Sequence, residues 1–365
     1  MFHNSMPRYE ILSSDALATL DSGWRKIVTE IGVQFAKPEA VELFAANGQK
    51  VDGETVFLDP EFVLEQVAKA PSEFDMQARN HDHDVHIGGD SMGFSSVYGP
   101  PFFRHGTERR DGSLADFENF AKLAQTFEVL DSVGGVVVEP NDAPLDSRHL
   151  DMVYRALTMT DKIIMGNVVT GTNAEDTVAM GEMVFGSREA IEETPFCISL
   201  INCNSPLRWD DRMLDSLFVY TQARQPCIVT PFLLMGAMAP VTIPAALAQQ
   251  IAEALSGVAL KAIHLRQELV QGLLALVIAA AETGAAMTAD SVDLVDEDDA
   301  GGVLLALLEH VTHTAGTDAD KHLDKVRTGN GEEGNIGLTG DRLGEQRLTG
   351  SRRAHQQHAL GHLAA

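Results

Sequence analysis

Three apolar stretches decide the fold: IIMGNVV over Ile163–Val169, FCISLI over Phe196–Ile201 and CIV over Cys227–Val229. Each is short, largely apolar and without polar alternation, which is typical of strands buried on both faces of a parallel sheet. The intervals between them, residues 174–185 and 213–223, carry apolar side chains at helical spacing. Strands that alternate with helices in this way predict a parallel sheet with helices on both faces.

The same alternation extends toward the N-terminus. We expect strands at Phe94–Tyr98 and Val133–Val138 and helices at residues 114–126 and 148–159. No glycine-rich dinucleotide-binding motif follows the first strand. The pattern therefore predicts a TIM-type (β/α)8 barrel, but its roughly five strand–helix units are too few to close one.

Residues 1–92 predict a separate N-terminal region of helices and a hairpin. Helical spacing runs over Ser14–Phe35 and over Pro38–Ala46, and the second helix should end at Asn47-Gly48. Asp52-Gly53 lies within Lys50–Leu58 and indicates a hairpin turn. Asp59-Pro60 should begin another helix.

The composition changes sharply in the C-terminal part. No Phe, Tyr or Trp follows Phe232, and no Pro follows Pro244. Because aromatic side chains supply much of the area buried in cores, we expect residues 93–260 to be the partial barrel and 261–365 a tail of different origin. Within this tail we expect helices at Leu269–Glu282 and Val303–Val311, followed by a disordered segment. An out-of-frame or fused reading of other DNA would explain the change.

Charge and cysteine content exclude several classes of protein. The chain has 27 Lys and Arg against 53 Asp and Glu, a formal net charge of -26, which argues against nucleic-acid binding. Three cysteines without CxxC spacing suit packed side chains in a reducing cytoplasm. The longest uninterrupted apolar run, near Leu273–Ala281, is too short to span a membrane, and the N-terminus lacks the pattern of a secretory signal.

The chemistry of a barrel lies at the C-terminal ends of its strands and in the loops that follow. Those positions hold one carboxylate, two amides and two aromatic rings, and we predict that they bind the substrate: Tyr98, Glu139, Asn202, Asn204 and Phe232. Aromatic faces and a carboxylate are the usual means of holding a quaternary ammonium group. Two alternatives stay open: the polar residues only shape turns, or Glu139 pairs with Arg148.

One segment is dense in metal-ligand types, NHDHDVH over Asn80–His86. On a strand, His81 and His83 would share one face while His86 points to the other, so tetrahedral convergence is awkward. We therefore predict no metal site there.

Several longer motifs resemble the trimethylamine methyltransferase family: GSLAD, GGVVVEP, RHLD, LTMTDK, NSPLRWD and PFLLMGAMAPVT, which begin at Gly112, Gly134, Arg148, Leu157, Asn204 and Pro231. The resemblance runs from about Leu12 to Leu260. It implies a TIM-type barrel that moves a methyl group from trimethylamine, glycine betaine or a similar amine to Co(I). The cobalamin (corrinoid) is then carried by a partner protein and is not bound directly. The resemblance leaves the catalytic residues unknown.

Two hypotheses follow. In the first, the chain is a corrinoid-dependent methyltransferase of the cytoplasm. In the second, it is a truncated, non-catalytic remnant or binding module of that family, because a parallel sheet with open edges favours pairing with another chain. Assembly into a homo-oligomer stays open in both.

Overall fold

The N-terminal region begins with a helix whose geometry changes before it ends. The computed structural model describes residues 2–6, 9–265 and 275–277. Helix α1 (Ser14–Lys26) starts at Ser13, whose Oγ accepts a hydrogen bond from the Ala16 amide at 3.3 Å. A π-helical turn, η1 (Ile27–Ile31), and strand β2 (Val33–Phe35) follow, separated by Gly32 at φ 80°. The predicted single helix over residues 14–35 is therefore wrong at its C-terminal end, where a left-handed glycine turns the chain into a strand.

A four-stranded sheet in the order β12-β2-β4-β3 joins this region to a later part of the chain. The predicted hairpin is confirmed as β3 (Lys50–Asp52) and β4 (Thr55–Phe57). Strand β12 (Arg208–Trp209) comes from far along the chain and runs parallel to β2. The predicted helices at residue 38 and residue 60 are confirmed as α2 (Pro38–Ala46) and α3 (Pro60–Val67).

The second four-stranded sheet is parallel throughout, in the order β10-β11-β13-β14. Its strands are β10 (Ile164–Met165), β11 (Cys197–Cys203), β13 (Cys227–Pro231) and β14 (Ala275–Val277). Parallel bridges from Ser95 to Ser132 and from Ser132 to Ile163 extend the wall on the β10 side. The parallel segments thus follow one another in chain order, as in the wall of a (β/α) barrel.

Two expected strands are wrong as regular strands. The segments 94–98 and 133–138 contain no strand; bridges at Ser95 and Ser132 and a hydrogen bond from the Met165 amide to the Gly134 carbonyl connect them to the sheet. Gly134, at φ 84°, places the backbone outside the extended region. The valines Val133, Val136, Val137 and Val138 are nevertheless buried, so the apolar pattern reports burial rather than strand geometry here.

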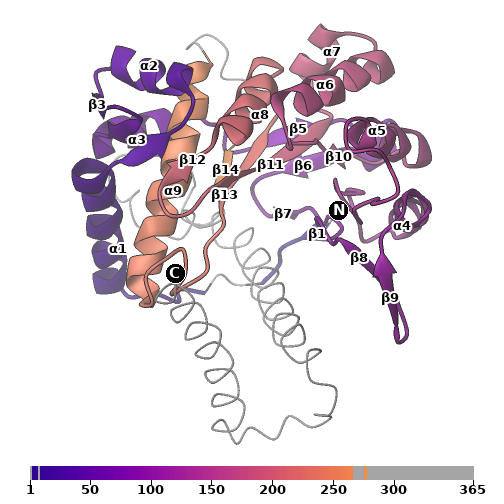
Figure 1. Cartoon of the computed structure of the whole chain (residues 1–365), viewed down its shortest axis with the longest axis horizontal. Helices are drawn as coiled ribbons and strands as arrows, with labels where there is room; N and C mark the ends of the chain where they lie inside the picture. The colour runs from indigo at the N-terminus through magenta and orange to yellow at the C-terminus, as the bar shows by residue number, and fades with distance from the viewer. Residues whose placement is uncertain (1, 7–8, 266–274, 278–365) are drawn as a thin grey trace, which may run out of the picture. The chain divides into compact units, whose positions relative to one another are not determined.

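The helices between the parallel segments are confirmed. They are α4 (Leu114–Thr126), α5 (Arg148–Met159), α6 (Gly171–Phe185) and α8 (Asp211–Gln222), with the short α7 (Arg188–Glu193) before β11 (Figure 1). Four of the helices, α4, α6, α7 and α8, begin at a Ser, Thr or Asp side chain that accepts a backbone N–H. Local capping and apolar spacing therefore explain where these helices begin.

Helix α9 (Ile243–His264) joins the two regions and was not predicted from sequence. It packs against α1, α3 and β13 (Figure 1). A side chain at Gly23 of α1 would come within 2.8 Å of the Ala248 Cβ, so the glycine permits close packing of α1 on α9. Among the described residues, α9 alone has the length and mean hydropathy (1.2) of a membrane span, but 72% of it is buried within the protein, as in a core helix.

The structure corrects one prediction for the C-terminal part. Residues 275–277, expected within a helix, form β14, which pairs with β13 at Cys227–Val229. Helix α9 also continues through Leu260 to His264. The expected helix at Val303–Val311 and the expected disordered segment lie outside the described residues.

The remaining short elements lie near the N-terminal side of the sheet or form a hairpin on α4. Strand β1 (Phe2–His3) pairs with β7 (Ser91–Met92), and β5 (Phe74–Met76) pairs with β6 (Val85–Ile87). The hairpin consists of β8 (Phe102–His105) and β9 (Glu108–Asp111).

Candidate functional site

Tyr98 lies at the C-terminal end of the first parallel segment, where the barrel pattern predicts chemistry. Its half-buried ring packs beside Gly135, at which a Cβ would come within 2.7 Å of the ring. Burial, and secondarily the nearby negative charge of Glu139, raise the pKa of the Tyr98 phenol to about 12. Tyr98 therefore presents a neutral, electron-rich aromatic ring close to a carboxylate.

Glu139 follows the second parallel segment and is held by its neighbours. Its Oε1 accepts a hydrogen bond from Arg148 Nη1 at 2.6 Å, and its amide donates to the Pro100 carbonyl at 2.9 Å. The ion pair is only partly shielded, with 31% of the Glu139 side chain and 12% of the Arg148 side chain exposed. The alternative of an Arg148 ion pair is thus realised, and it leaves part of the carboxylate accessible to a ligand.

Asn202 and Asn204 lie at the C-terminal end of β11, where the sheet is regular. Asn202 is paired with Thr230 of β13, and its Oδ1 accepts a hydrogen bond from the Thr230 hydroxyl. Asn204 is exposed, and its Nδ2 donates to Asp210 Oδ2 at 3.1 Å. Both side-chain amides are thus partly occupied by protein partners, as the turn-shaping alternative expects. Asn202 is fixed by a neighbouring strand, whereas Asn204 is bonded within its own loop.

A buried carboxylate that the sequence did not reveal holds the loop after β11. Glu253 of α9 accepts hydrogen bonds from the Leu207 amide and the Ser205 hydroxyl, each at 2.7 Å, and from Gln249 Nε2 at 2.8 Å. Burial raises the pKa of Glu253, although these hydrogen bonds act in the opposite direction. The only sequence signal is an acidic residue within an otherwise apolar helix, which indicates a buried polar contact.

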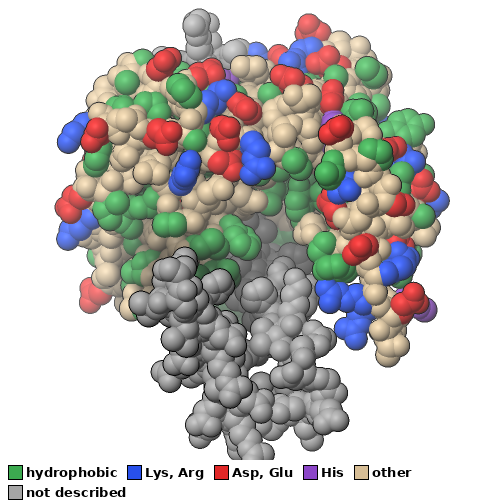
Figure 2. Space-filling model, viewed as in Figure 1, with side chains coloured by type: hydrophobic (Ala, Val, Ile, Leu, Met, Phe, Trp, Pro, Cys, Tyr) green, Lys and Arg blue, Asp and Glu red, His purple; other side chains and the backbone are tan. Residues whose placement is uncertain are grey.

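Phe232 is the candidate that the structure least supports as part of one site. It lies just beyond β13 and is 62% exposed, in a loop that also exposes Leu234, Met235 and Val241. Figure 2 shows hydrophobic side chains gathered on part of this face of the molecule. The structure brings Tyr98 near Glu139 and Asn202 onto Thr230, whereas Phe232 stands as a separate apolar surface.

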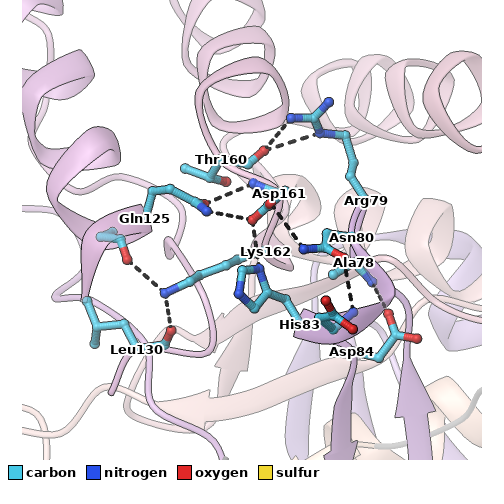
Figure 3. Close-up of polar contacts among 12 residues, drawn as sticks. Ala78, Arg79, Asn80, His83, Asp84, Gln125, Leu130, Thr160, Asp161 and Lys162 are labelled. Atoms are coloured by element: carbon cyan, nitrogen blue, oxygen red, sulfur yellow. Dashed lines mark hydrogen bonds and ion pairs between the residues drawn. The ribbon is translucent and has the colours of Figure 1, made fainter. Parts of the chain in front are cut away.

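The histidine-rich segment is a structural network at the opposite strand ends (Figure 3). His81–His83 form a 3-10 turn rather than a strand, and His83 Nδ1 lies 2.7 Å from Asp161 Oδ1, just before β10. Burial would raise the pKa of Asp161, but hydrogen bonds from Gln125 and His83 lower it overall. Among the described residues, no group of three His, Cys, Asp or Glu is placed to hold a metal ion.

Two cavities among the described residues are relevant to ligand binding. The cavity beside Tyr98, Gly135 and Asn167 has a volume of about 10 Å³, which is room for about one water molecule. A groove of about 570 Å³ lies beside Arg79, His81 and Phe185, at the N-terminal strand ends. Tyr98 and Glu139 lie at the opposite, C-terminal ends of the parallel segments, which is where (β/α) barrel enzymes carry their chemistry, and we take them as the candidate site.

The cysteines are buried and free, as predicted. Burial raises the pKa of the Cys197, Cys203 and Cys227 thiols, so none has the thiolate character of a nucleophile. Lys261 of α9 is fully buried, with its Nζ 3.3 Å from Cys227 Sγ.

Comparison with known proteins identifies relatives of this chain. A family model described as trimethylamine methyltransferase (MTTB) matches residues 1–269. Glycine betaine methyltransferase of Desulfitobacterium hafniense (strain Y51) is 39% identical over 256 residues, which cover 70% of this chain and 53% of that protein. Proline betaine:corrinoid methyltransferase of Eubacterium limosum is 24% identical over 245 residues, covering 64% of this chain and 50% of that protein. The chain thus spans about half the length of these curated relatives.

A solved structure also resembles this one. The monomethylamine methyltransferase of Methanosarcina barkeri matches with a TM-score of 0.48 and 10% identity, over 69% of this chain and 52% of that one.

Proposed function

Because the chain belongs to the trimethylamine methyltransferase family, we propose that it takes part in moving a methyl group from a methylated amine to a Co(I) corrinoid on a partner protein. The observation that carries the proposal is that Tyr98 and Glu139 both lie at the C-terminal ends of the parallel segments, where the charge of Glu139 acts on the Tyr98 phenol. The corrinoid is the methyl acceptor, delivered by the partner. The names of relatives, such as proline betaine:corrinoid methyltransferase, support this acceptor.

Tyr98 and Glu139 suit a quaternary ammonium group. Such a group carries a positive charge but has no N–H to donate, so it is held by aromatic faces and by carboxylates rather than by hydrogen bonds. The neutral ring of Tyr98 offers a face, and the accessible part of Glu139 offers the charge. A methylammonium group at this position would therefore balance the negative charge of the Glu139 carboxylate, which Arg148 only partly covers.

Arg148 makes a betaine the first substrate to test. A betaine carries a carboxylate as well as a quaternary nitrogen, and an arginine fork matches a carboxylate. In the free protein Arg148 pairs with Glu139 through Nη1, while its Nε and Nη2 donate to the Ala143 carbonyl. A betaine would give each a new partner of opposite charge. The 39% identity to glycine betaine methyltransferase supports the same choice.

Transfer of the methyl group needs position more than acid or base. With a quaternary ammonium substrate, the methyl carbon would bond to Co(I) as the carbon–nitrogen bond breaks, and the nitrogen would keep the bonding electron pair and leave as a neutral tertiary amine, so no proton would move. The work of the protein is to hold the methyl carbon in line with cobalt. Asn202, oriented by Thr230, and the more exposed Asn204 would orient the polar end of the substrate, and Phe232 would add apolar surface at the rim.

The test is methyl transfer itself. The full chain is mixed with glycine betaine, proline betaine or trimethylamine and with free cob(I)alamin or a cobalamin-loaded corrinoid protein, and methylcobalamin absorbance is followed. We expect methylcobalamin to form with at least one substrate and to form more slowly with the Glu139→Gln variant. Absence of methylcobalamin with every pair of substrate and acceptor would show that this chain is not a competent methyltransferase.

A second candidate is a non-catalytic binding module of the same family. The small cavity beside Tyr98, the existing Glu139–Arg148 pair and the coverage of about half of each relative favour it. Thermal unfolding followed by circular dichroism, with light scattering, separates the two candidates. A monomer with one cooperative transition supports the enzyme, whereas soluble aggregates without a sharp transition support the remnant.

We further propose the division of the chain into residues 1–92, 93–260 and 261–365, with the middle part as a partial barrel, and a cytoplasmic location without nucleic-acid or membrane partners.

A further inference from the structure

The β8–β9 hairpin presents two arginines side by side on one face. In its register, Arg104 lies directly opposite Arg109, and Phe103 lies opposite Arg110. Residues directly opposite each other on an antiparallel pair share a face, so Arg104 and Arg109 point to the same side. Like charges in this position destabilise a hairpin. The pair therefore calls for an explanation beyond the fold.

Arg110 lies on the opposite face of the hairpin, together with Phe103. Phe103 packs on Phe120 of α4 with ring centroids 6.0 Å apart, and Arg110 pairs with Asp116 of α4 through Nη2 and Oδ1 at 2.8 Å. This face anchors the hairpin to α4. Hydrogen bonds from Arg110 and Ser113 keep the Asp116 carboxyl ionised by lowering its pKa, in spite of its burial. Arg110 thus anchors the hairpin to α4 through an ion pair.

On the other face, the side chains of Arg104 and Arg109 make contacts within the hairpin, but no carboxylate of the described residues neutralises their charge. The Arg109 guanidinium lies 3.9 Å from the centroid of the Phe102 ring, and Arg104 Nε donates to the Gly106 carbonyl at 3.1 Å. Within the described part of the chain, neither arginine forms an ion pair with a carboxylate. Figure 2 shows Lys and Arg side chains gathered where Figure 1 places β8 and β9. The positive charge of this pair contrasts with the net charge of -26 of the chain.

The base of the hairpin is bonded to the candidate site. The Gly112 amide donates to the Pro101 carbonyl at 3.2 Å, and the Glu139 amide donates to the Pro100 carbonyl at 2.9 Å. A side chain at Gly112 would come within 2.6 Å of the Glu139 carbonyl oxygen, so the two backbones touch. The hairpin that carries Arg104 and Arg109 is therefore joined at its base to the backbone of Glu139.

We propose that Arg104 and Arg109 dock a carboxylate-rich surface of the partner protein that carries the corrinoid, an inference that rests on the proposed function. Arginine forks match carboxylates in a bidentate geometry, and a carboxylate between the two guanidinium groups relieves their repulsion. The acidic remainder of the chain repels an acidic partner, so the hairpin steers it to the site. Glu108 and Asp111 flank the pair and favour a short protein contact over the extended phosphate backbone of a nucleic acid.

The test uses the full chain and the double variant Arg104→Glu/Arg109→Glu. The control is Lys26→Glu/Lys50→Glu, which changes the net charge equally at two exposed lysines of the N-terminal region. Because Arg104 and Arg109 are exposed, both variants should melt like the wild type. Binding of a labelled 20-residue polyglutamate peptide is measured by fluorescence anisotropy at two salt concentrations, with duplex DNA and anionic phospholipid vesicles as alternative probes.

We expect the wild type and the control to bind the peptide in a salt-dependent manner, and the arginine variant to bind it at least about tenfold more weakly. The apparent KM for a cobalamin-loaded corrinoid protein should rise similarly, while methyl transfer to free cob(I)alamin should stay at the wild-type rate. Equal peptide binding by the wild type and the arginine variant, or tighter binding of DNA or vesicles than of the peptide, would overturn the proposal. Failure of wild-type transfer to free cob(I)alamin concerns the proposed function alone, because peptide binding still tests the hairpin.

Discussion

The parallel sheet and the segments bridged to it position their polar side chains in two different ways. On the β11–β13 side, a regular ladder places Asn202 opposite Thr230, and the buried Glu253 of α9 fixes the loop that follows. On the other side, the segments that carry Tyr98 and Glu139 form no regular strand and join the sheet through bridges at Ser95 and Ser132 and a hydrogen bond from the Met165 amide to the Gly134 carbonyl. Their backbone is fixed by glycine turns and by the Glu139–Arg148 pair instead.

This difference predicts that one side of the sheet contributes mainly to stability and the other mainly to ligand binding. Regular strands backed by a buried helix contribute most of the cooperative stability, whereas irregular segments with partly exposed polar groups contribute less and can rearrange around a ligand. We therefore expect substitutions on the β11–β13 side to change the free energy of unfolding. Substitutions on the Tyr98–Glu139 side should change ligand affinity.

The largest effect is expected at Trp209. Its side chain is fully buried, and its Nε1 donates to Ser256 Oγ of α9 at 3.1 Å. Trp209→Ala should lower the free energy of unfolding by about 3–5 kcal/mol, because it leaves a cavity between β12 and α9. Urea denaturation measures the change, with Val97→Ala at an exposed position of the other side as the control. Similar losses for both variants would remove the distinction between the two sides.

Glu253 should give the next largest effect. Glu253→Leu leaves the Leu207 amide and the Ser205 hydroxyl without their acceptor, so we expect a loss of about 2–3 kcal/mol. Glu253→Gln keeps one acceptor oxygen and should lose less. The same denaturation experiment measures both variants, and equal losses for Leu and Gln would argue against a role for these hydrogen bonds.

The pH dependence of stability offers a further test at Glu253. Because burial raises its pKa in the folded protein, the native state binds a proton more tightly than the unfolded state. Its contribution is fully present below the ordinary carboxyl pKa and is lost as the pH rises through the raised value. The slope should be at most about 1.4 kcal/mol per pH unit for one proton. Glu253→Gln should flatten the profile in this window, and an unchanged profile would show that Glu253 does not titrate there.

The smallest change in stability is expected at Glu139. Its ion pair with Arg148 is partly exposed to solvent, and such pairs contribute little, so Glu139→Gln should cost less than about 1 kcal/mol. A loss as large as that of Trp209→Ala would place Glu139 among the residues that hold the fold together.

The sequence predicted the helices better than the strands and the site. Apolar spacing is a local signal, and it placed α4 and α5 at their observed bounds. The valines before Glu139 predicted burial correctly but strand geometry wrongly, because Gly134 at φ 84° interrupts the extended backbone. Helix α9 is apolar on nearly all sides and therefore lacks the amphipathic period by which helices are recognised.

The contacts of the candidate site residues depend on partners that are distant in the sequence. The sequence placed Glu139 at a strand end and named Arg148 as one alternative, but only the fold decides that the two side chains meet. Glu253 lies 48 residues from Ser205 along the chain, and no local pattern connects them. The Asp161 network likewise joins three separate segments (Figure 3), which explains why the histidine-rich motif could not be interpreted alone.

The most direct test of the account is calorimetric binding of glycine betaine to the wild type and to Glu139→Gln. The comparison ligand is 3,3-dimethylbutanoate, which has the same shape with carbon in place of the charged nitrogen. The account predicts that the wild type prefers glycine betaine and that Glu139→Gln loses about 1–3 kcal/mol of affinity for it, with little change for the uncharged analogue. Equal affinity of both proteins for glycine betaine, or no binding to the wild type, would contradict the assignment of Tyr98 and Glu139 as a site for a quaternary ammonium group.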